Sequence, residues 1–273
     1  MRSRSSIPIR QAMLDRAQAI FIHLATTSRQ RKQRTADLDR KLLGPICQTM
    51  CGKFTQMMSW REVCELSDLV GLTERIPVDE VVIGTPMRMC RVIHLDQAGK
   101  RANSPMRWGF VDARAKSPLE RPKHMHARAE TIDQLPTFAD AFASRRGILL
   151  TNTFNVGQDM SNGRTIQHTI TPRDGKPIAI AVIWEKWERR NDGTLFTFVM
   201  VTTPANSLIG TVTDRMPAIL RPEHWSMWLG ETTASRPQLK EVLQTFTGDW
   251  EMAEQKKPEP RKSTRNSTQA ALF

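Results

Sequence analysis

Cys51 is the residue whose type and position suggest the most distinctive chemistry in this chain. It directly follows an internal methionine, in the pentapeptide Met50–Phe54 (MCGKF). If translation begins at Met50 and that methionine is removed, Cys51 carries a free α-amine beside its thiol. The amine then condenses with an aldehyde to an imine, and the thiolate closes on the same carbon to give a thiazolidine, a covalent capture of the carbonyl. The alternative is that Cys51 is a small buried apolar residue, as free cysteines often are.

Four further segments follow the pentapeptide in order along the chain. They are Pro105–Phe110 (PMRWGF), His126–Thr131 (HARAET), Arg146–Leu150 (RGILL) and Thr213–Leu220 (TDRMPAIL). Taken together, the five segments resemble the SRAP family, the SOS response-associated peptidases or abasic-site processing proteins, and the match runs from about Met50 to Glu231. The resemblance implies an α+β fold, with a single SRAP-like domain built on a curved, barrel-like, mostly antiparallel sheet with flanking helices.

The resemblance also implies a function, which is covalent capture of abasic sites in single-stranded DNA during the DNA damage (SOS) response. The N-terminal cysteine, here Cys51, would condense with the ring-opened aldehyde of the abasic sugar in a basic DNA channel. The peptidase name of the family would correspond to removal of the residues ahead of Cys51, or to hydrolysis of a peptide by the same thiol. No metal or organic cofactor is required by this chemistry.

The sequence departs from the family pattern at four polar positions. His126 stands where the family has asparagine, Lys53 replaces an arginine, Val156 falls at the catalytic glutamate and Thr213 at the catalytic histidine. An aliphatic side chain cannot move a proton, and a general acid or base typically contributes about 10²–10⁴-fold. We therefore expect slower capture rather than none, because an aminothiol reacts with aldehydes unaided.

His126 is the remaining candidate for a catalytic side chain beside Cys51. Its imidazole titrates near neutrality, so it could act as a general acid or base. It could equally replace the family's asparagine as a hydrogen-bonding group, or be an ordinary surface histidine. The alignment that places Val156 at the glutamate is ungapped, and Asn155 and Asp159 lie close to it in the chain.

The retained parts of the motifs supply candidate DNA-binding residues. Arg128, Arg215 and Lys53 would hold phosphate, since a guanidinium fork matches phosphate geometry. A structural ion pair, for instance with Glu130 or Asp214, is an equally good interpretation of the two arginines.

Two further side chains of these motifs could also contact the nucleic acid. Trp108 could stack on an exposed base, as aromatic residues do in proteins that bind single strands, or it could be a core residue. Thr131 could donate its hydroxyl to a phosphate.

Composition narrows the class of protein. The 273 residues carry a net charge of +12, and residues 1–49 hold ten Lys and Arg against three Asp, a net of +7. A basic chain suits a phosphate-rich partner because binding releases counterions.

The four cysteines at positions 47, 51, 64 and 90 form no CxxC pair, so we predict reduced thiols in a cytoplasmic, nucleoid-associated, bacterial-type protein without a metal site. The apolar stretches are too short to span a membrane, and we expect a monomer.

The chain is predicted to have three parts. Residues 1–49 form a basic extension, with an amphipathic helix over Gln11–Ala25, that is absent from a native protein starting at Met50. Residues 50–247 form the domain, and residues 248–273 a disordered tail, because Lys, Glu, Pro and Ser dominate there.

Within the domain, periodicity predicts helices over residues 59–69, 136–143 and 237–247, and strands over residues 81–83, 89–93, 148–154, 178–187 and 195–202. Asn191-Asp192-Gly193 is a hairpin signal between the last two strands.

Two other functions remain open from the sequence. The first is a non-catalytic module that binds single-stranded DNA and uses Cys51 only for packing. The second is a thiol autopeptidase with Cys51 and His126 as a Cys–His pair.

Overall fold

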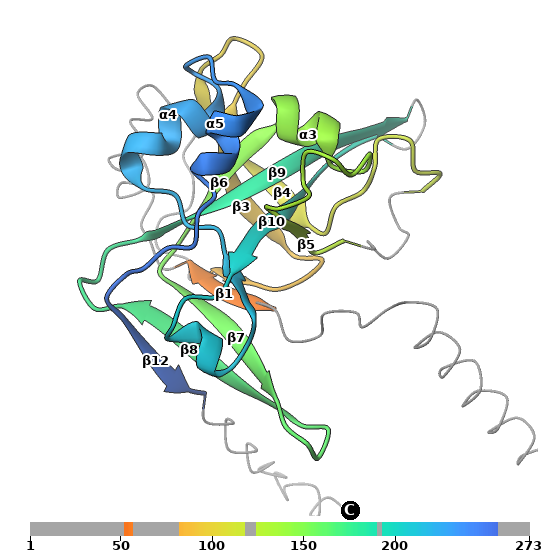
Figure 1. Ribbon diagram of the computed structural model, residues 1–273. Helices are drawn as coiled ribbons and strands as arrows, with labels where there is room; N and C mark the ends of the chain where they lie inside the picture. Colours follow the sequence, from red (N-terminus) through yellow and green to blue (C-terminus); the bar gives the residue numbers. More distant parts are fainter. Residues whose placement is uncertain (1–51, 57–81, 118–123, 190–192, 256–273) are drawn as a thin grey trace, which may run out of the picture. The chain divides into compact units, whose positions relative to one another are not determined.

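The structure is a computed structural model that describes residues 52–56, 82–117, 124–189 and 193–255 (Figure 1). The chain divides into two compact units, Met1–Gln48 and Thr49–Phe273, and every described residue belongs to the second. The helices predicted over residues 11–25 and 59–69 lie outside the described residues, and so does Cys51.

Five strands form a closed barrel, in which each strand has a neighbour on both sides. The order around the barrel is β10–β4–β3–β6–β9 and back to β10. All these neighbours are antiparallel except β4 and β10, which pair in parallel. The strands are β3 (Met89–Leu95), β4 (Arg101–Trp108), β6 (Arg146–Thr151), β9 (Ile178–Arg189) and β10 (Gly193–Pro204). The predicted barrel-like α+β fold is confirmed.

A second sheet is antiparallel throughout and contains the strand that follows Cys51 in the chain. Its order is β12–β8–β7–β1–β2. The strands are β1 (Lys53–Gln56), β2 (Val82–Gly84), β7 (Thr153–Asp159), β8 (Thr165–Pro172) and β12 (Trp250–Glu254). Gly84 is required opposite Phe54, because a Cβ at Gly84 would lie 2.0 Å from the Phe54 ring.

Two hydrophobic cores lie on opposite faces of the barrel strands. On β9, Ala179, Ala181 and Ile183 join a core that includes helix residues. The alternate residues, Ile178, Ile180 and Val182, join a core shared with the second sheet, which we call the inter-sheet core. Because side chains alternate along a strand and both faces of β9 are buried, its sequence is a continuous apolar run.

The helices are short and pack against the barrel (Figure 1). They are α3 (Ala139–Ser144), α4 (Trp225–Leu229) and α5 (Arg236–Glu241), with single 3-10 turns η1 (Ile209–Thr211) and η2 (Pro222–His224). Helix α5 begins at a capping box between Ser235 and Gln238, one residue before the start of the predicted helix, and ends well before residue 247. Helix α3 begins three residues after the predicted start at 136 and ends one residue after the predicted end at 143.

One prediction about the strands was wrong. The segment 148–154 is not one strand but the end of β6 and the start of β7, which belong to different sheets. At this turn, the Thr151 hydroxyl lies within hydrogen-bonding distance of the carbonyls of Thr55 (2.6 Å) and Thr153 (2.8 Å). The short strand β5 (His126–Arg128), which pairs in parallel with β10, was not predicted at all.

The predicted start of the disordered tail at residue 248 was also wrong. Residues 250–254 form β12, which pairs with β8. Trp250 anchors this strand, since its ring packs edge-on against Phe154 and stacks on Phe246. A single aromatic anchor is easily missed when a segment is judged by its charged and polar composition.

Candidate functional site

The candidate site is built around the first residue of β1. Lys53 is half-buried and directly opposes Asn155 of β7, and Phe54 opposes Phe154 with no exposed surface. Cys51 precedes Lys53 by two residues in the sequence. The fold therefore fixes the chain just after Cys51 against the segment of β7 that contains Val156.

The Trp108 ring packs between Phe54 of this strand and His126. Its ring centroid lies 5.4 Å from that of Phe54 and 5.9 Å, edge-on, from that of the half-buried His126. The Trp108 side chain is 0% exposed, and its indole N–H donates to the Met125 carbonyl at 3.0 Å. A fully covered ring offers no face to a base, so the burial supports the core interpretation of Trp108. What it contributes to the site is the position of His126 relative to β1.

The two arginines predicted to hold phosphate differ sharply in environment. Arg215 is 7% exposed. Its guanidinium donates hydrogen bonds to both carboxylate oxygens of Glu130, at 2.5 and 2.9 Å, and to the Thr202 carbonyl at 2.7 Å. This hydrogen-bonded partner holds the pKa of Glu130 below its ordinary value. The structural ion pair is thus the interpretation that the geometry supports for Arg215.

Arg128 is placed differently, at the end of β5. Its side chain is exposed and forms no ion pair with any residue in the described part of the chain. Its charge acts on Glu130 only as a minor contribution to that lowered pKa, well behind the hydrogen bond from Arg215. Arg128 is therefore available to an external anion, which Arg215 is not.

The two substituted positions contain no group suited to proton transfer. Val156 is 0% exposed within the inter-sheet core. Thr213 follows η1 and is 8% exposed, and its buried hydroxyl has no hydrogen-bond partner in the part of the chain that the structure describes. A threonine hydroxyl is a poor base, so neither side chain offers a group for proton transfer; that these two positions are the catalytic ones stays a prediction. Thr131 lies at the turn after β5, where its amide donates to the Arg128 carbonyl at 3.1 Å.

Asn155 is a polar residue of this region that was noted in the sequence only as a neighbour of Val156. It is 1% exposed, and its amide nitrogen donates to the Thr169 hydroxyl at 3.0 Å. Its buried amide oxygen has no hydrogen-bond partner among the described residues. A buried acceptor left unpaired costs about 1–3 kcal/mol. The signal in the sequence was an asparagine at an otherwise apolar strand position, between Phe154 and Val156.

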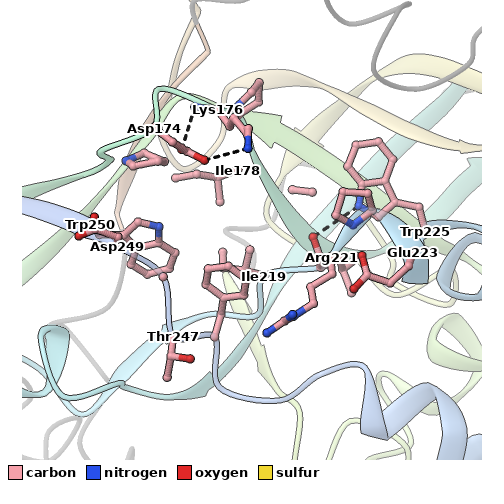
Figure 2. Close-up of a pocket in the computed structure, with 17 residues that line it drawn as sticks. Asp174, Lys176, Ile178, Ile219, Arg221, Glu223, Trp225, Thr247, Asp249 and Trp250 are labelled. Atoms are coloured by element: carbon pink, nitrogen blue, oxygen red, sulfur yellow. Dashed lines mark hydrogen bonds and ion pairs between the residues drawn. The ribbon is translucent and has the colours of Figure 1, made fainter.

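A separate cavity of about 480 Å³ opens where the loop after β8, η2 and the segment before β12 meet. Figure 2 shows the Asp174–Lys176 ion pair on one side of it and Trp225 on the other. Arg221 at its wall lies 5.7 Å from the Phe246 ring. None of the described residues predicted for the site lines this cavity, so it is distinct from the region around β1.

No group of three or more His, Cys, Asp or Glu side chains in the described residues is arranged to hold a metal ion. Within the same residues, no helix has the length and apolarity needed to cross a membrane.

Comparison with known proteins identifies the family to which this chain belongs. Residues 50–257 match the family model for SOS response associated peptidase (SRAP), and the chain belongs to this family. Over 200 residues it is 26% identical to the abasic site processing proteins YoqW and YoaM of Bacillus subtilis, covering 73% of this chain and 89% and 88% of theirs.

Solved structures share the fold. A protein from Bacteroides thetaiotaomicron superposes with a TM-score of 0.63 at 22% identity, covering 75% of this chain and 91% of that one. A protein from Bordetella bronchiseptica superposes with a TM-score of 0.62 at 22% identity, covering 76% of this chain and 100% of that one.

Proposed function

We propose that this protein binds single-stranded DNA and captures abasic sites covalently through Cys51 as its N-terminal residue. The observation that carries the proposal is the family match, which begins at Met50, immediately ahead of Cys51. The names of the relatives, abasic site processing proteins, support abasic DNA as the substrate class. The anchoring of Lys53 and Phe54 against β7 supports it, because it fixes the chain next to the reactive residue.

The chemistry needs one amine, one thiol and one aldehyde. The α-amine of Cys51 adds to the aldehyde carbon, the carbinolamine loses its oxygen as water to give an imine, and the sulfur then adds to the same carbon. Two bonds to carbon form, to nitrogen and to sulfur, and the carbonyl oxygen leaves as water with two hydrogens. Anchoring of the DNA phosphate by Arg128 would bring the aldehyde close and so raise its effective concentration.

Protein expressed from Met50, with that methionine removed, tests the proposal. The residues from Thr49 onwards form one compact unit, and the family domain begins at residue 50, so this chain keeps the whole folding unit. Mixed with single-stranded DNA bearing one abasic site, it should give an adduct that survives denaturation. Cys51→Ala should give none, and Cys90→Ala is the matched control that should react normally. The full 273-residue chain, whose Cys51 amine is in a peptide bond, should also give none.

A second candidate is a binding module without covalent chemistry. The burial of Val156 and the unpartnered hydroxyl of Thr213 favour it, since neither supplies proton transfer. Normal binding of abasic DNA by the Cys51-initiated protein, with no adduct over hours, would establish this module and reject capture.

A further inference from the structure

The cavity beside β12 lies apart from the region around β1 and has aromatic residues on two sides. Trp225 lies on one side and Trp250 on the opposite side (Figure 2). Buried aliphatic residues complete the lining: Ile178, Ala179, Ile219 and Leu220. Small-molecule sites are mostly apolar cavities of about 300–1,000 Å³ with a few polar groups, and this one has about 480 Å³. Its size and lining suit a flat organic ligand.

The Trp250 side of the cavity combines three flat groups. The half-buried Phe246 ring stacks on the Trp250 ring, with centroids 5.3 Å apart and planes at 21°. The Arg221 guanidinium carbon lies 5.7 Å from the Phe246 centroid. Gly248 makes the ring pair possible, because a Cβ there would lie 2.5 Å from the Phe246 ring and 2.7 Å from the Trp250 indole nitrogen. The segment before β12 therefore presents a fixed aromatic wall against which a planar ligand can pack.

The charged residues around the cavity leave one cation and one anion without an ion-pair partner. Two ion pairs, each of 3.3 Å, neutralise the other charges: Lys176 with Asp174, and Arg173 with Asp249. Arg221 and Glu223 form neither an ion pair nor a side-chain hydrogen bond with any residue in the described ranges. In Figure 2 the Arg221 side chain extends towards Thr247 and away from Glu223. The two charges are therefore open to different parts of one ligand.

We propose that this cavity binds a nucleotide whose base has an exocyclic amino group, such as cytosine. Glu223 accepts a hydrogen bond from that amino group, as carboxylates do from the amino group of cytosine. The base packs on the apolar lining between Trp225 and Phe246, since aromatic side chains hold bases by stacking. Arg221 binds the phosphate, because its planar guanidinium matches phosphate geometry. The inference goes beyond the proposed function, since neither Cys51 nor an aldehyde takes part.

A nucleotide fits these groups better than a free amino acid, which also has a cationic and an anionic end. An amino acid carries its ammonium and its carboxylate on the same carbon atom, so it cannot reach two charges that point apart. In a nucleotide the sugar separates the phosphate from the amino edge of the base. The net charge of +12 also favours an anionic ligand, because the field of the whole chain attracts it.

Calorimetric titration of the full 273-residue chain with dCMP tests the proposal. The Cys51 amine of this chain is in a peptide bond, so the proposed capture does not contribute. Two ligands that each lack one group serve as comparisons: dUMP has a carbonyl in place of the amino group, and deoxycytidine has no phosphate. We expect dCMP to bind about tenfold more tightly than either, which is close to the contribution of one hydrogen bond to a charged group.

Substitutions assign the two contacts separately. Glu223→Gln should remove the preference for dCMP over dUMP, because an amide can also donate to the uracil carbonyl. Arg221→Gln should remove the preference for dCMP over deoxycytidine. Glu241→Gln and Arg236→Gln, the same changes at exposed residues of α5, are the matched controls and should alter neither preference. Absence of dCMP binding at millimolar concentration, equal affinities for dCMP and dUMP, or preferences that survive both cavity substitutions would overturn the inference.

A labelled deoxycytidine oligonucleotide separates two sources of the nucleotide. Weaker oligonucleotide binding by Glu223→Gln and Arg221→Gln than by their controls would assign a nucleotide of a DNA strand to the cavity. Unchanged oligonucleotide binding by variants that no longer discriminate dCMP would assign a free nucleotide. Both results are independent of whether Cys51 captures abasic sites, which the adduct experiment decides.

Discussion

Replacing Arg128 and Arg215 by alanine, one at a time, should give opposite phenotypes. Arg128 is exposed at the end of β5 and forms no ion pair with a described residue, so its loss should weaken DNA binding and leave the fold intact. Arg215 is buried and bonded to Glu130 and the Thr202 carbonyl, so its loss should destabilise the fold. Both residues belong to family motifs, and only their environments separate them.

The expected magnitudes follow from these contacts. Loss of one phosphate contact with a single strand lowers the slope of log binding constant against log salt concentration by about 0.7. Raising the salt from 50 to 200 mM should therefore weaken DNA binding by Arg128→Ala roughly 2.6-fold less than it weakens binding by the unsubstituted protein. For Arg215→Ala, breaking a fully buried ion pair would cost about 3–5 kcal/mol. The Glu130 side chain is 45% exposed and can be rehydrated. We therefore expect about 1.5–3 kcal/mol, the range for hydrogen bonds to a charged group.

Two measurements check the pair of variants. Fluorescence anisotropy of a labelled single strand gives the salt slope, and urea unfolding gives the stability. Arg114→Ala is the control for loss of surface charge, because that exposed guanidinium is already held by Asp112 at 2.7 Å. An Arg128→Ala variant with an unchanged salt slope would refute the phosphate assignment. An Arg215→Ala variant of unchanged stability would refute the structural one.

Two further predictions concern ionisable groups. Burial raises the pKa of Cys90 to about 12, so at pH 8 only about 10⁻⁴ of its thiol is ionised. Mass spectrometry of native protein treated with iodoacetamide should therefore find Cys90 unmodified. Rapid labelling of Cys90 would contradict its burial. The pKa of Glu130 is lowered, mainly by its hydrogen bond from Arg215, so the stability that this group contributes is present above its ordinary value of 4.5 and is lost as the pH falls through the lower folded value. Unfolding by urea should therefore show Glu130→Gln to be less stable than the unsubstituted protein at pH 7. The difference in free energy of unfolding between the two proteins should narrow below about pH 4. A difference that stays constant with pH would show that ionisation of Glu130 does not contribute to stability.

The sequence predicted those parts of the fold in which one strand is buried on both faces. The apolar run 178–187 and the β-branched run 195–202 lie within β9 and β10, which pair antiparallel across the predicted hairpin position. It missed β4 and β8, whose sequences RANSPMRW and TIQHTITP are largely polar. Such strands are specified by pairing with neighbours distant in the chain, and that information is absent from local periodicity.

The candidate site was predictable in its residues and not in their roles. Motif order alone singled out Arg128, Arg215 and Trp108, each with two interpretations. The choice between them depends on contacts across the fold, such as the 85-residue separation between Arg215 and Glu130. A short-range pattern cannot report whether an arginine meets a carboxylate of the protein or remains free for one of the DNA phosphates.

The proposed covalent capture would place unequal demands on the parts of the site, and these demands can explain the departures from the family pattern. Both new bonds to carbon come from Cys51, so no other side chain has to act as a nucleophile. Proton transfer is less demanding in position, because any imidazole or carboxylate within reach of the carbinolamine oxygen can perform it. A valine at position 156 is therefore compatible with the proposed capture provided that another group supplies the proton.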